Sequence, residues 1–306
     1  MSDFAVQFIP VTVTPATTWL FVSLSDGETV GWGEATLEKY EQAVADCFNV
    51  LPDRLTVADL SRLRFDTLPQ AALSSALRQA HADLAARIAG VSLADFLGRA
   101  ERDQIAIYAN INRSTLDQRL MVDCHWRFDV AGAGMLIDAC APLNLYWIEC
   151  PILETEAGIP ELVLLRGRAN AAGMRLAGLE TAILREGFAP YLAAGAYDVM
   201  MPDVKYCGGP HEMLAISADM ARHGVAFSPH NPSGPICHMH SVHICATLPQ
   251  EELLETQFNE TPMFDSLVDH AMPQPIGGRI TLPMTMAGLG LSLIVPESEP
   301  EPQPGI

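Results

Sequence analysis

The first hundred residues carry two different patterns of apolar positions. Residues 4–30 are rich in β-branched and aromatic side chains, and the sequence SDG separates the runs TWLFVSLSD and ETVGWGEA, which predicts a β-hairpin. Residues 38–98 show helical spacing instead, with a helix stop at Gly90 and apolar residues at Leu73, Leu77, Leu84 and Ile88. We therefore expect residues 1–104 to form a small α+β domain.

From residue 105 onward, short apolar runs end in polar residues at regular intervals. The polar residues are Asp123, Glu149, Glu180, Asp203, His230 and Glu255, and the successive intervals are 26, 31, 23, 27 and 25 residues. A strand, a helix and two loops need roughly 25–30 residues, so this spacing predicts repeated βα units with parallel strands. In a β/α barrel the carboxyl ends of the strands meet at one mouth, where we expect the six side chains. The alternative is six unrelated polar residues at the beginnings of loops.

The charge of the chain narrows the range of partners. The 306 residues include 18 Lys and Arg against 37 Asp and Glu, for a formal net charge of −19. Nucleic acid and anionic membrane surfaces are therefore not expected as partners, whereas a divalent cation is, because carboxylates attract one. Apolar residues make up 49% of the chain, enough for a substantial core, which excludes a fibrous or globally disordered protein.

The cysteines and the hydrophobic runs indicate the cellular compartment in which we expect the protein. Seven cysteines form no C-x-x-C pair, and their odd number is typical of reduced thiols rather than of a disulfide scaffold. Neither an export signal nor an uncharged apolar run of about 18 residues is visible. We expect a cytoplasmic protein with a disordered, Pro- and Glu-rich end over residues 296–306.

Several segments together resemble one known family. The chain is similar to the mandelate racemase/muconate lactonizing enzyme-like branch of the enolase superfamily in the order and spacing of VGWGEATLE, IYANINRST, MVDCHWRFD, YWIECPI, LAGLE, MPDVKYCGG, SPHNPSGP, LLETQF and PIGGRITLPMTMAGLGL. The resemblance implies a modified TIM-type α/β barrel over residues 105–264. It also implies an α+β capping domain made of residues 1–104 and about 265–295.

The resemblance further implies a metal site. The shared reaction of the family begins with removal of a proton next to a carboxylate, and Mg²⁺ stabilises the negative charge that results. By position, Asp123, Glu149 and Glu180 resemble the three metal ligands. Each offers the hard oxygen donors that Mg²⁺ prefers. The alternative for each is an ordinary carboxylate at the end of a strand.

A base and its supporting residues are implied in the same way. His230 and Asp203 resemble the His-Asp dyad of the family, with His230 as the base and Asp203 orienting its ring. The alternative is a core histidine bonded to a structural aspartate. Glu255 resembles the glutamate of the eighth strand, which bonds to a substrate carboxylate oxygen, although a structural role competes with this interpretation.

The pattern Asp-x-His-x-Arg resembles the acid-sugar dehydratases of this branch. His125 lies two residues after Asp123, and positions two apart on a strand face the same side. The resemblance implies that His125 is the general acid for a departing β-hydroxyl group. Arg127 either binds a carboxylate or hydroxyl group of the substrate or pairs with an acidic side chain. Lys205 either faces the mouth or forms an ion pair with a metal-ligand carboxylate, and receives no catalytic role.

The sequence departs from the family after the first barrel strand. Asp123 follows Asn112 by only 11 positions, and this interval lacks the lysine motif of the second strand. A parallel crossover needs about a dozen residues or more, so we expect an incomplete barrel without the second-strand region. Without that lysine there is no second base, which disfavours racemisation and leaves dehydration chemically feasible.

These inferences predict an enzyme that dehydrates a sugar acid. The expected cofactor is Mg²⁺, the expected partner is a small sugar acid, and the chain is expected to form a homo-oligomer. Two alternatives stay open: a catalytically inactive remnant or subunit partner, and a sugar-acid cycloisomerase or epimerase.

Two further groups of residues have the composition of a site. The run from Cys237 to Cys245, with His240 and His243, is suggestive of soft-metal binding, although helix packing is favoured. Cys124 next to His125 is a poor nucleophile candidate, because neighbouring strand residues point to opposite faces.

Overall fold

The N-terminal domain is an antiparallel sheet covered by a long helix. The computed structural model describes residues 3–110, 120–249, 253–257 and 261–294. The sheet has the order β3-β2-β1-β4, and its strands are β1 (Asp3–Thr14), β2 (Thr17–Ser25), β3 (Val30–Glu34) and β4 (Arg54–Thr56). The predicted hairpin joins β2 to β3, and Asp26 closes its turn by accepting bonds from the backbone N–H groups of Glu28 and Thr29.

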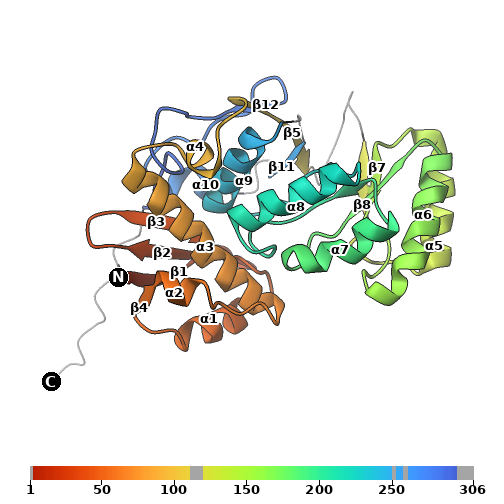
Figure 1. Cartoon of the computed structure of the whole chain (residues 1–306). Coiled ribbons are helices and arrows are strands. Elements are labelled where there is room, and N and C mark those ends of the chain that lie inside the picture. The colour runs from red at the N-terminus through yellow and green to blue at the C-terminus, as the bar shows by residue number, and fades with distance from the viewer. Residues whose placement is uncertain (1–2, 111–119, 250–252, 258–260, 295–306) are drawn as a thin grey trace.

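Helix α3 (Leu68–Ala89) packs closely on strand β3 (Figure 1). The approach requires glycine, because a Cβ atom at Gly31 or Gly33 would collide with the backbone of α3 at Ala80 or Ala76. The helix ends at Gly90, which is left-handed as the predicted stop requires. The predicted helical region is divided, since α1 (Glu41–Asn49), β4 and α2 (Val57–Leu60) precede α3, and α4 (Leu93–Leu97) follows it.

The second half of the chain alternates strands and helices. A five-stranded parallel sheet has the order β10-β9-β8-β7-β6. Its strands are β6 (Met121–Asp123), β7 (Trp147–Glu149), β8 (Arg175–Gly178), β9 (Val199–Met200) and β10 (Ala226–Phe227). The helices that follow them are α5 (Val130–Cys140), α6 (Ile159–Ala171), α7 (Leu184–Ala194), α8 (Pro210–Arg222) and α9 (Pro235–Thr247). The predicted βα repeats are therefore present, in a TIM-barrel-like arrangement.

A smaller sheet joins the beginning and the end of the barrel region. Strand β5 (Gln104–Asn110) pairs in parallel with β11 (Leu254–Gln257) and antiparallel with β12 (Arg279–Thr281). Within the described residues, no ladder joins β5 to β6. Asn112 and residues 111–119, which underlie the expectation of an incomplete barrel, lie outside the described part, as do residues 296–306. Short helical turns complete the elements: Ala141–Leu143, Glu156–Gly158 and α10 (Met263–Ser266).

The C-terminal segment returns to the N-terminal domain. In Figure 1 the blue C-terminal segment passes beside α4, and the backbone N–H of Leu93 donates to the carbonyl oxygen of Gly288 at 2.8 Å. The Asp83 carboxylate of α3 accepts bonds from the backbone N–H of Leu289 at 2.8 Å and of Trp32 in β3 at 2.9 Å. The Arg87 side chain, from the next turn of α3, donates to the carbonyl oxygen of Leu291. One buried aspartate thus joins the helix, the sheet and the C-terminal segment.

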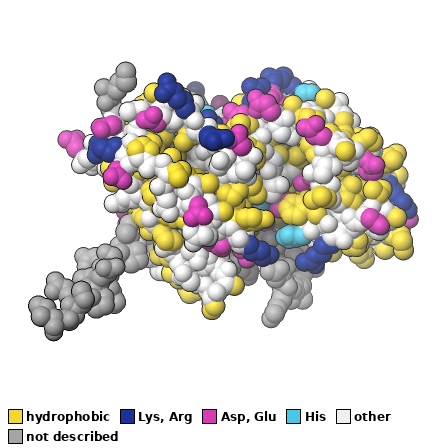
Figure 2. Space-filling model, turned by 90° about the horizontal axis from the view of Figure 1, so that it is seen from below, with side chains coloured by type: hydrophobic (Ala, Val, Ile, Leu, Met, Phe, Trp, Pro, Cys, Tyr) yellow, Lys and Arg dark blue, Asp and Glu magenta, His cyan; other side chains and the backbone are white. Residues whose placement is uncertain are grey.

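The interior of the strand region is lined by its own apolar cluster. Trp147, Ala177, Val199 and Met201 form this cluster, and Tyr108 of β5 packs against it. On the outside, acidic and basic side chains are scattered among apolar ones over the face shown in Figure 2. None of the helices in the described ranges combines the length and the apolar character needed to cross a membrane.

Candidate functional site

Two acidic side chains meet at the ends of neighbouring strands. Asp123 and Glu149 are the last residues of β6 and β7 and are register partners in that parallel pair. Oxygen atoms of both, together with the Cys150 sulfur, lie within 4.8 Å of one another. Glu149 is buried, and the Trp147 indole donates to its Oε2 at 3.0 Å. The short parallel register therefore creates a compact acidic group at the carboxyl edge of the sheet.

Glu180 lies beside this group rather than within it. It follows β8, and its Oε2 atom accepts from the Cys150 thiol at 3.6 Å. The same oxygen lies 3.6 Å from Nε2 of His230. Glu180 therefore stands between the Asp123–Glu149 pair and the histidine.

The donor set fits Mg²⁺. Burial, followed by the charges of Glu255 and Asp123, raises the pKa of Glu149 well above its usual range. A divalent cation would relieve this crowding of carboxylates, and carboxylate oxygens are the donors that Mg²⁺ prefers. Burial also raises the pKa of the Cys150 thiol well above its usual value, so it stays protonated and is a poor metal ligand. Asp123 and Glu149, with Glu180 on the next strand, are the residues that would hold the ion.

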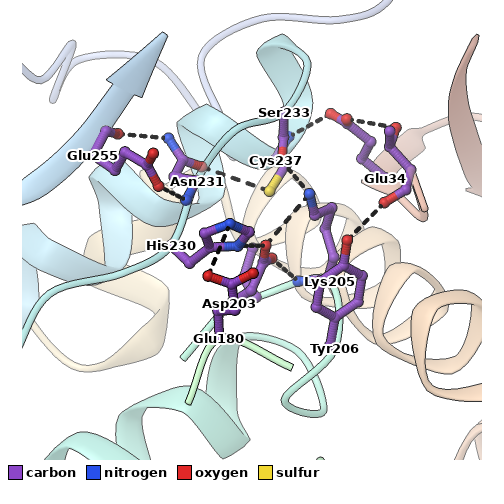
Figure 3. A network of polar contacts seen from close by, with 12 residues as sticks. Glu34, Glu180, Asp203, Lys205, Tyr206, His230, Asn231, Ser233, Cys237 and Glu255 are labelled. Carbon is purple, nitrogen blue, oxygen red and sulfur yellow. Dashed lines mark hydrogen bonds and ion pairs between the residues drawn. The ribbon is translucent and has the colours of Figure 1, made fainter. Parts of the chain in front are cut away.

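His230 and Asp203 form a hydrogen-bonded pair (Figure 3). Nδ1 of His230 lies 2.8 Å from Oδ2 of Asp203, which leaves Nε2 facing Glu180. Burial lowers the pKa of His230, but Glu180 and the bond to Asp203 outweigh it and raise this pKa to about 10. A cation held by the neighbouring carboxylates would oppose their effect on the ring.

Lys205 supports Asp203 and does not face the mouth. The side chain is almost fully buried, and its Nζ lies 3.3 Å from Oδ2 of Asp203 and contacts the hydroxyl group of Ser233. Its backbone N–H donates to Oδ1 of the same carboxylate at 2.8 Å. Although burial raises the pKa of Asp203, Lys205 and His230 lower it below the usual range, so Asp203 is ionised. The structure thus shows an ion pair of Lys205, but with Asp203 of the dyad and not with one of the three candidate metal ligands.

His125 and Arg127 lie in the turn after β6. The premise that His125 continues the strand is wrong, because β6 ends at Asp123 and the φ angles of His125 and Trp126 are 48° and 55°. The turn nevertheless brings Nδ1 of His125 to 2.5 Å from Oδ2 of Asp123. The His125 side chain is 59% exposed, so it lies at the solvent side of the acidic group. Arg127 is exposed as well.

Glu255 anchors the loop that carries His230. It lies buried in β11, and its Oε2 accepts from the backbone N–H of Asn231 at 2.8 Å. The Asn231 side chain donates to the backbone carbonyl oxygen of Glu255 at 3.0 Å. The structure thus shows a positioning role for Glu255, directly after the histidine.

The sequence analysis missed Glu34, which joins the N-terminal domain to this loop. Glu34 ends strand β3 and is completely buried. Its carboxylate accepts from the backbone N–H groups of Gly234 at 2.8 Å and Cys237 at 2.9 Å, and from the Thr36 hydroxyl group at 2.8 Å. It therefore caps the beginning of α9, the helix that follows the His230 loop (Figure 3). The signal was the acidic residue that ends the otherwise apolar GWGEA segment.

The histidines of α9 pack the helix. Nε2 of His240 bonds to the carbonyl oxygen of Trp32 at 2.9 Å, and His243 accepts from the backbone N–H of Ala94 at 3.1 Å. Burial lowers the pKa of His240 to about 3 and that of His243 to about 4, so both are neutral. In the described part of the chain, the candidate metal group is the one at Asp123 and Glu149, not this run. Burial also raises the pKa of Cys124 to about 12, which makes its thiol a poor nucleophile.

A TIM-barrel-like fold with acidic side chains at the carboxyl ends of its strands, and a separate N-terminal domain, defines a broad class of α/β-barrel proteins. Within that class, the chain belongs to the family described as Enolase C-terminal domain-like, whose model matches residues 77–297.

Two curated relatives are similar to part of the chain. The chain is 34% identical to an L-rhamnonate dehydratase from Saccharopolyspora erythraea over 176 residues, which are 57% of the chain and 44% of the relative. It is 32% identical to a D-galactonate dehydratase from Verminephrobacter eiseniae over 178 residues, 56% of the chain and 45% of that relative. The chain thus spans less than half of the length of these relatives.

The structure of the 3,6-anhydro-D-galactonate cycloisomerase from Zobellia galactanivorans is similar with a TM-score of 0.82. The similarity covers 96% of this chain and 97% of that one. At 17% identity this likeness shows the fold alone.

Proposed function

We propose that the chain is a Mg²⁺-dependent hydro-lyase that dehydrates a sugar acid. One observation carries the proposal: the hydrogen-bonded His230–Asp203 pair turns Nε2 toward Glu180, beside Asp123 and Glu149. A base next to a group of cation ligands is the arrangement that removal of a proton adjacent to a carboxylate requires. The names of the two curated relatives support sugar acids as the substrate class.

In this proposal His230 takes the proton from the carbon next to the substrate carboxylate. Asp203 holds the ring by Nδ1 and stabilises the imidazolium that forms. A Mg²⁺ ion held by Asp123, Glu149 and Glu180 would stabilise the negative charge that develops on the carboxylate. Glu255 and Asn231 fix the loop on which His230 is carried.

The second half of the reaction needs an acid. The electron pair left by the proton forms a carbon–carbon double bond and expels the β-hydroxyl group. That group takes a proton from His125 and departs as water, and the remaining enol gains a proton to give a 2-keto-3-deoxy acid. The contact of His125 with Asp123 supports this role for His125. In the same proposal Arg127, which is exposed in that turn, binds a carboxylate or hydroxyl group of the substrate.

Dehydration is favoured over racemisation because a second base is lacking. Racemisation needs a base on each face of the substrate. The whole sequence contains two lysines, Lys39 and Lys205. Lys39 is exposed in the N-terminal domain, and Lys205 is buried behind Asp203.

We also propose that the barrel lacks its second βα unit. Ten residues lie between the end of β5 and the beginning of β6, fewer than the dozen or more that a parallel crossover needs.

Magnesium titration by calorimetry is the first test. Saturable binding is expected for the natural chain, with strong weakening in Glu149→Gln and no change in Glu186→Gln, which alters an exposed glutamate of α7. If the Glu149→Gln variant binds Mg²⁺ as the natural chain does, the metal site is assigned wrongly. If neither binds, the inactive-remnant alternative takes precedence.

The second test follows the chemistry. Incubation of sugar acids with the protein in deuterated water is expected to yield a 2-keto-3-deoxy acid, and His230→Asn is expected to abolish solvent exchange of the proton while Mg²⁺ affinity stays nearly the same. Persistent exchange in that variant would refute the assignment of the base. An isomeric product without loss of water would indicate a cycloisomerase or epimerase.

A further inference from the structure

A buried hydroxyl group inside the strand region makes no hydrogen bond to the described residues. Tyr108 of β5 is the register partner of Glu255 in β11, and its ring packs on the apolar cluster around Trp147. The ring centroids of Tyr108 and Trp147 are 5.3 Å apart, with the planes perpendicular. The Tyr108 hydroxyl oxygen is buried, and it has no hydrogen-bond partner among the described residues. Native structures rarely leave such a group unpaired.

The two aromatic side chains next to the acidic group, Trp147 and Tyr108, differ in their hydrogen bonds. The Trp147 indole already donates to Glu149, one of the candidate metal ligands. The Tyr108 phenol lies in the field of three site carboxylates, those of Glu255, Glu149 and Glu180, without bonding to them. Burial and these charges raise the pKa of the phenol well above its usual value, so the group keeps its proton and acts as a donor.

A neighbouring hydroxyl group does not satisfy Tyr108. The Ser228 side chain lies near enough to lower the pKa of the phenol as a hydrogen-bonding group. The contact does not reach the geometry of a hydrogen bond, and the Tyr108 hydroxyl oxygen has no partner of that geometry among the described residues. The Ser228 hydroxyl donates its own proton to the carbonyl oxygen of Leu253 at 2.7 Å. The Tyr108 hydroxyl group is therefore a hydrogen-bond donor held in place inside the barrel, next to the acidic group. No acceptor for it lies within hydrogen-bond geometry among the described residues.

We propose that Tyr108 binds the substrate by donating its hydroxyl proton to an oxygen of the bound sugar acid. The inference rests on the proposed function and adds a binding residue to it. A sugar acid carries the hydroxyl and carboxylate oxygens that such a donor needs. Because the phenol is held by ring packing and not by a bond of its own, it is oriented before the substrate arrives, which lowers the entropic cost of binding.

The substitution Tyr108→Phe tests the inference because it removes one oxygen atom and keeps the ring. In the metal-free protein, the melting temperature is expected to stay the same or to rise, since an unpaired buried hydroxyl group does not stabilise the fold. A fall of several degrees in the melting temperature would show that the hydroxyl group stabilises the fold through a partner such as Ser228. That result would overturn the inference, whatever the effect of the substitution on activity.

Substrate affinity is the second measurement. Galactonate and rhamnonate are titrated calorimetrically with Mg²⁺ present, in a His230→Asn background that prevents turnover. Tyr108→Phe is expected to weaken binding roughly ten- to a hundredfold and to leave Mg²⁺ affinity unchanged. The matched control is Tyr146→Phe. The ring centroids of Tyr146 and Trp147 are also close, 5.2 Å apart, but the Tyr146 ring is covered by the guanidinium group of Arg175.

The outcomes separate the inference from the proposed function. If the parent binds a sugar acid and Tyr108→Phe binds it equally well, the inference is overturned and the proposed function stands. If the parent binds Mg²⁺ but neither sugar acid, the substrate class is wrong, and the inference fails with it.

Discussion

Replacing Glu34 with alanine removes the carboxylate that connects the N-terminal domain to the His230 loop. In the natural chain this carboxylate accepts from the backbone N–H groups of Gly234 and Cys237 and from the Thr36 hydroxyl group. All three donors are buried. The Thr36 hydroxyl group can rotate toward another acceptor, but the two N–H groups are fixed by the beginning of α9.

The expected cost follows from those two N–H groups. Leaving a buried donor unpaired costs about 1–3 kcal/mol, so Glu34→Ala is expected to lower the free energy of unfolding by about 2–6 kcal/mol. A typical domain has only about 5–15 kcal/mol in total, so the change should be large. Glu34→Gln keeps one acceptor oxygen but turns an NH₂ group toward a backbone donor, and we expect an intermediate loss.

Urea unfolding at pH 7, followed by tryptophan fluorescence, measures these differences. The matched control is Glu38→Ala, an exposed glutamate four residues along the chain, which is expected to change stability by less than about 0.5 kcal/mol. If Glu34→Ala loses less than about 1 kcal/mol, the N–H groups find other partners and the capping argument is refuted.

Three further predictions concern stability. Burial raises the pKa of Asp83 to about 6, so the stability linked to its protonated form is fully present below pH 4 and is lost as the pH rises through 6. Urea titrations should therefore show the free energy of unfolding of the natural chain, relative to Asp83→Asn, falling by about 3 kcal/mol between pH 4 and above pH 6. Gly33→Ala should cost about 3 kcal/mol by collision with α3, whereas Gly167→Ala, in an exposed turn of α6, should stabilise by about 0.5–1 kcal/mol, as thermal melts can show. Lys205→Met should cost about 3–5 kcal/mol by leaving Asp203 charged and unpaired, and Lys205→Arg should restore part of this; equal stability of the natural chain and Lys205→Met in urea would contradict the ion pair.

Much of the site was predictable because parallel strands repeat. The spacing of the apolar runs predicts the ends of the strands and one mouth shared by their polar residues, where Asp123 and Glu149 meet. The pairing of Asp203 with His230 is implied by the family resemblance and not by the spacing. The hairpin and the stop at Gly90 depend on local turn chemistry and were equally visible.

Contacts between distant segments were not predictable in the same way. Glu34 and Gly234 are 200 residues apart, and no local pattern links them. The position of Lys205 depended on where its long side chain finds an acceptor. The sequence does not show that β6 ends two residues before His125, because propensity does not fix where a three-residue strand stops.

The contacts of α3 with the C-terminal segment constrain how the protein is made. The N–H group of Leu289 reaches the Asp83 carboxylate from 206 residues further along the chain. At a synthesis rate of about 5–20 residues per second, that segment leaves the ribosome roughly 10–40 s after α3. During this interval the N-terminal sheet and its helix can assemble, but the buried Asp83 lacks one of its donors. The N-terminal domain therefore emerges first and is completed last.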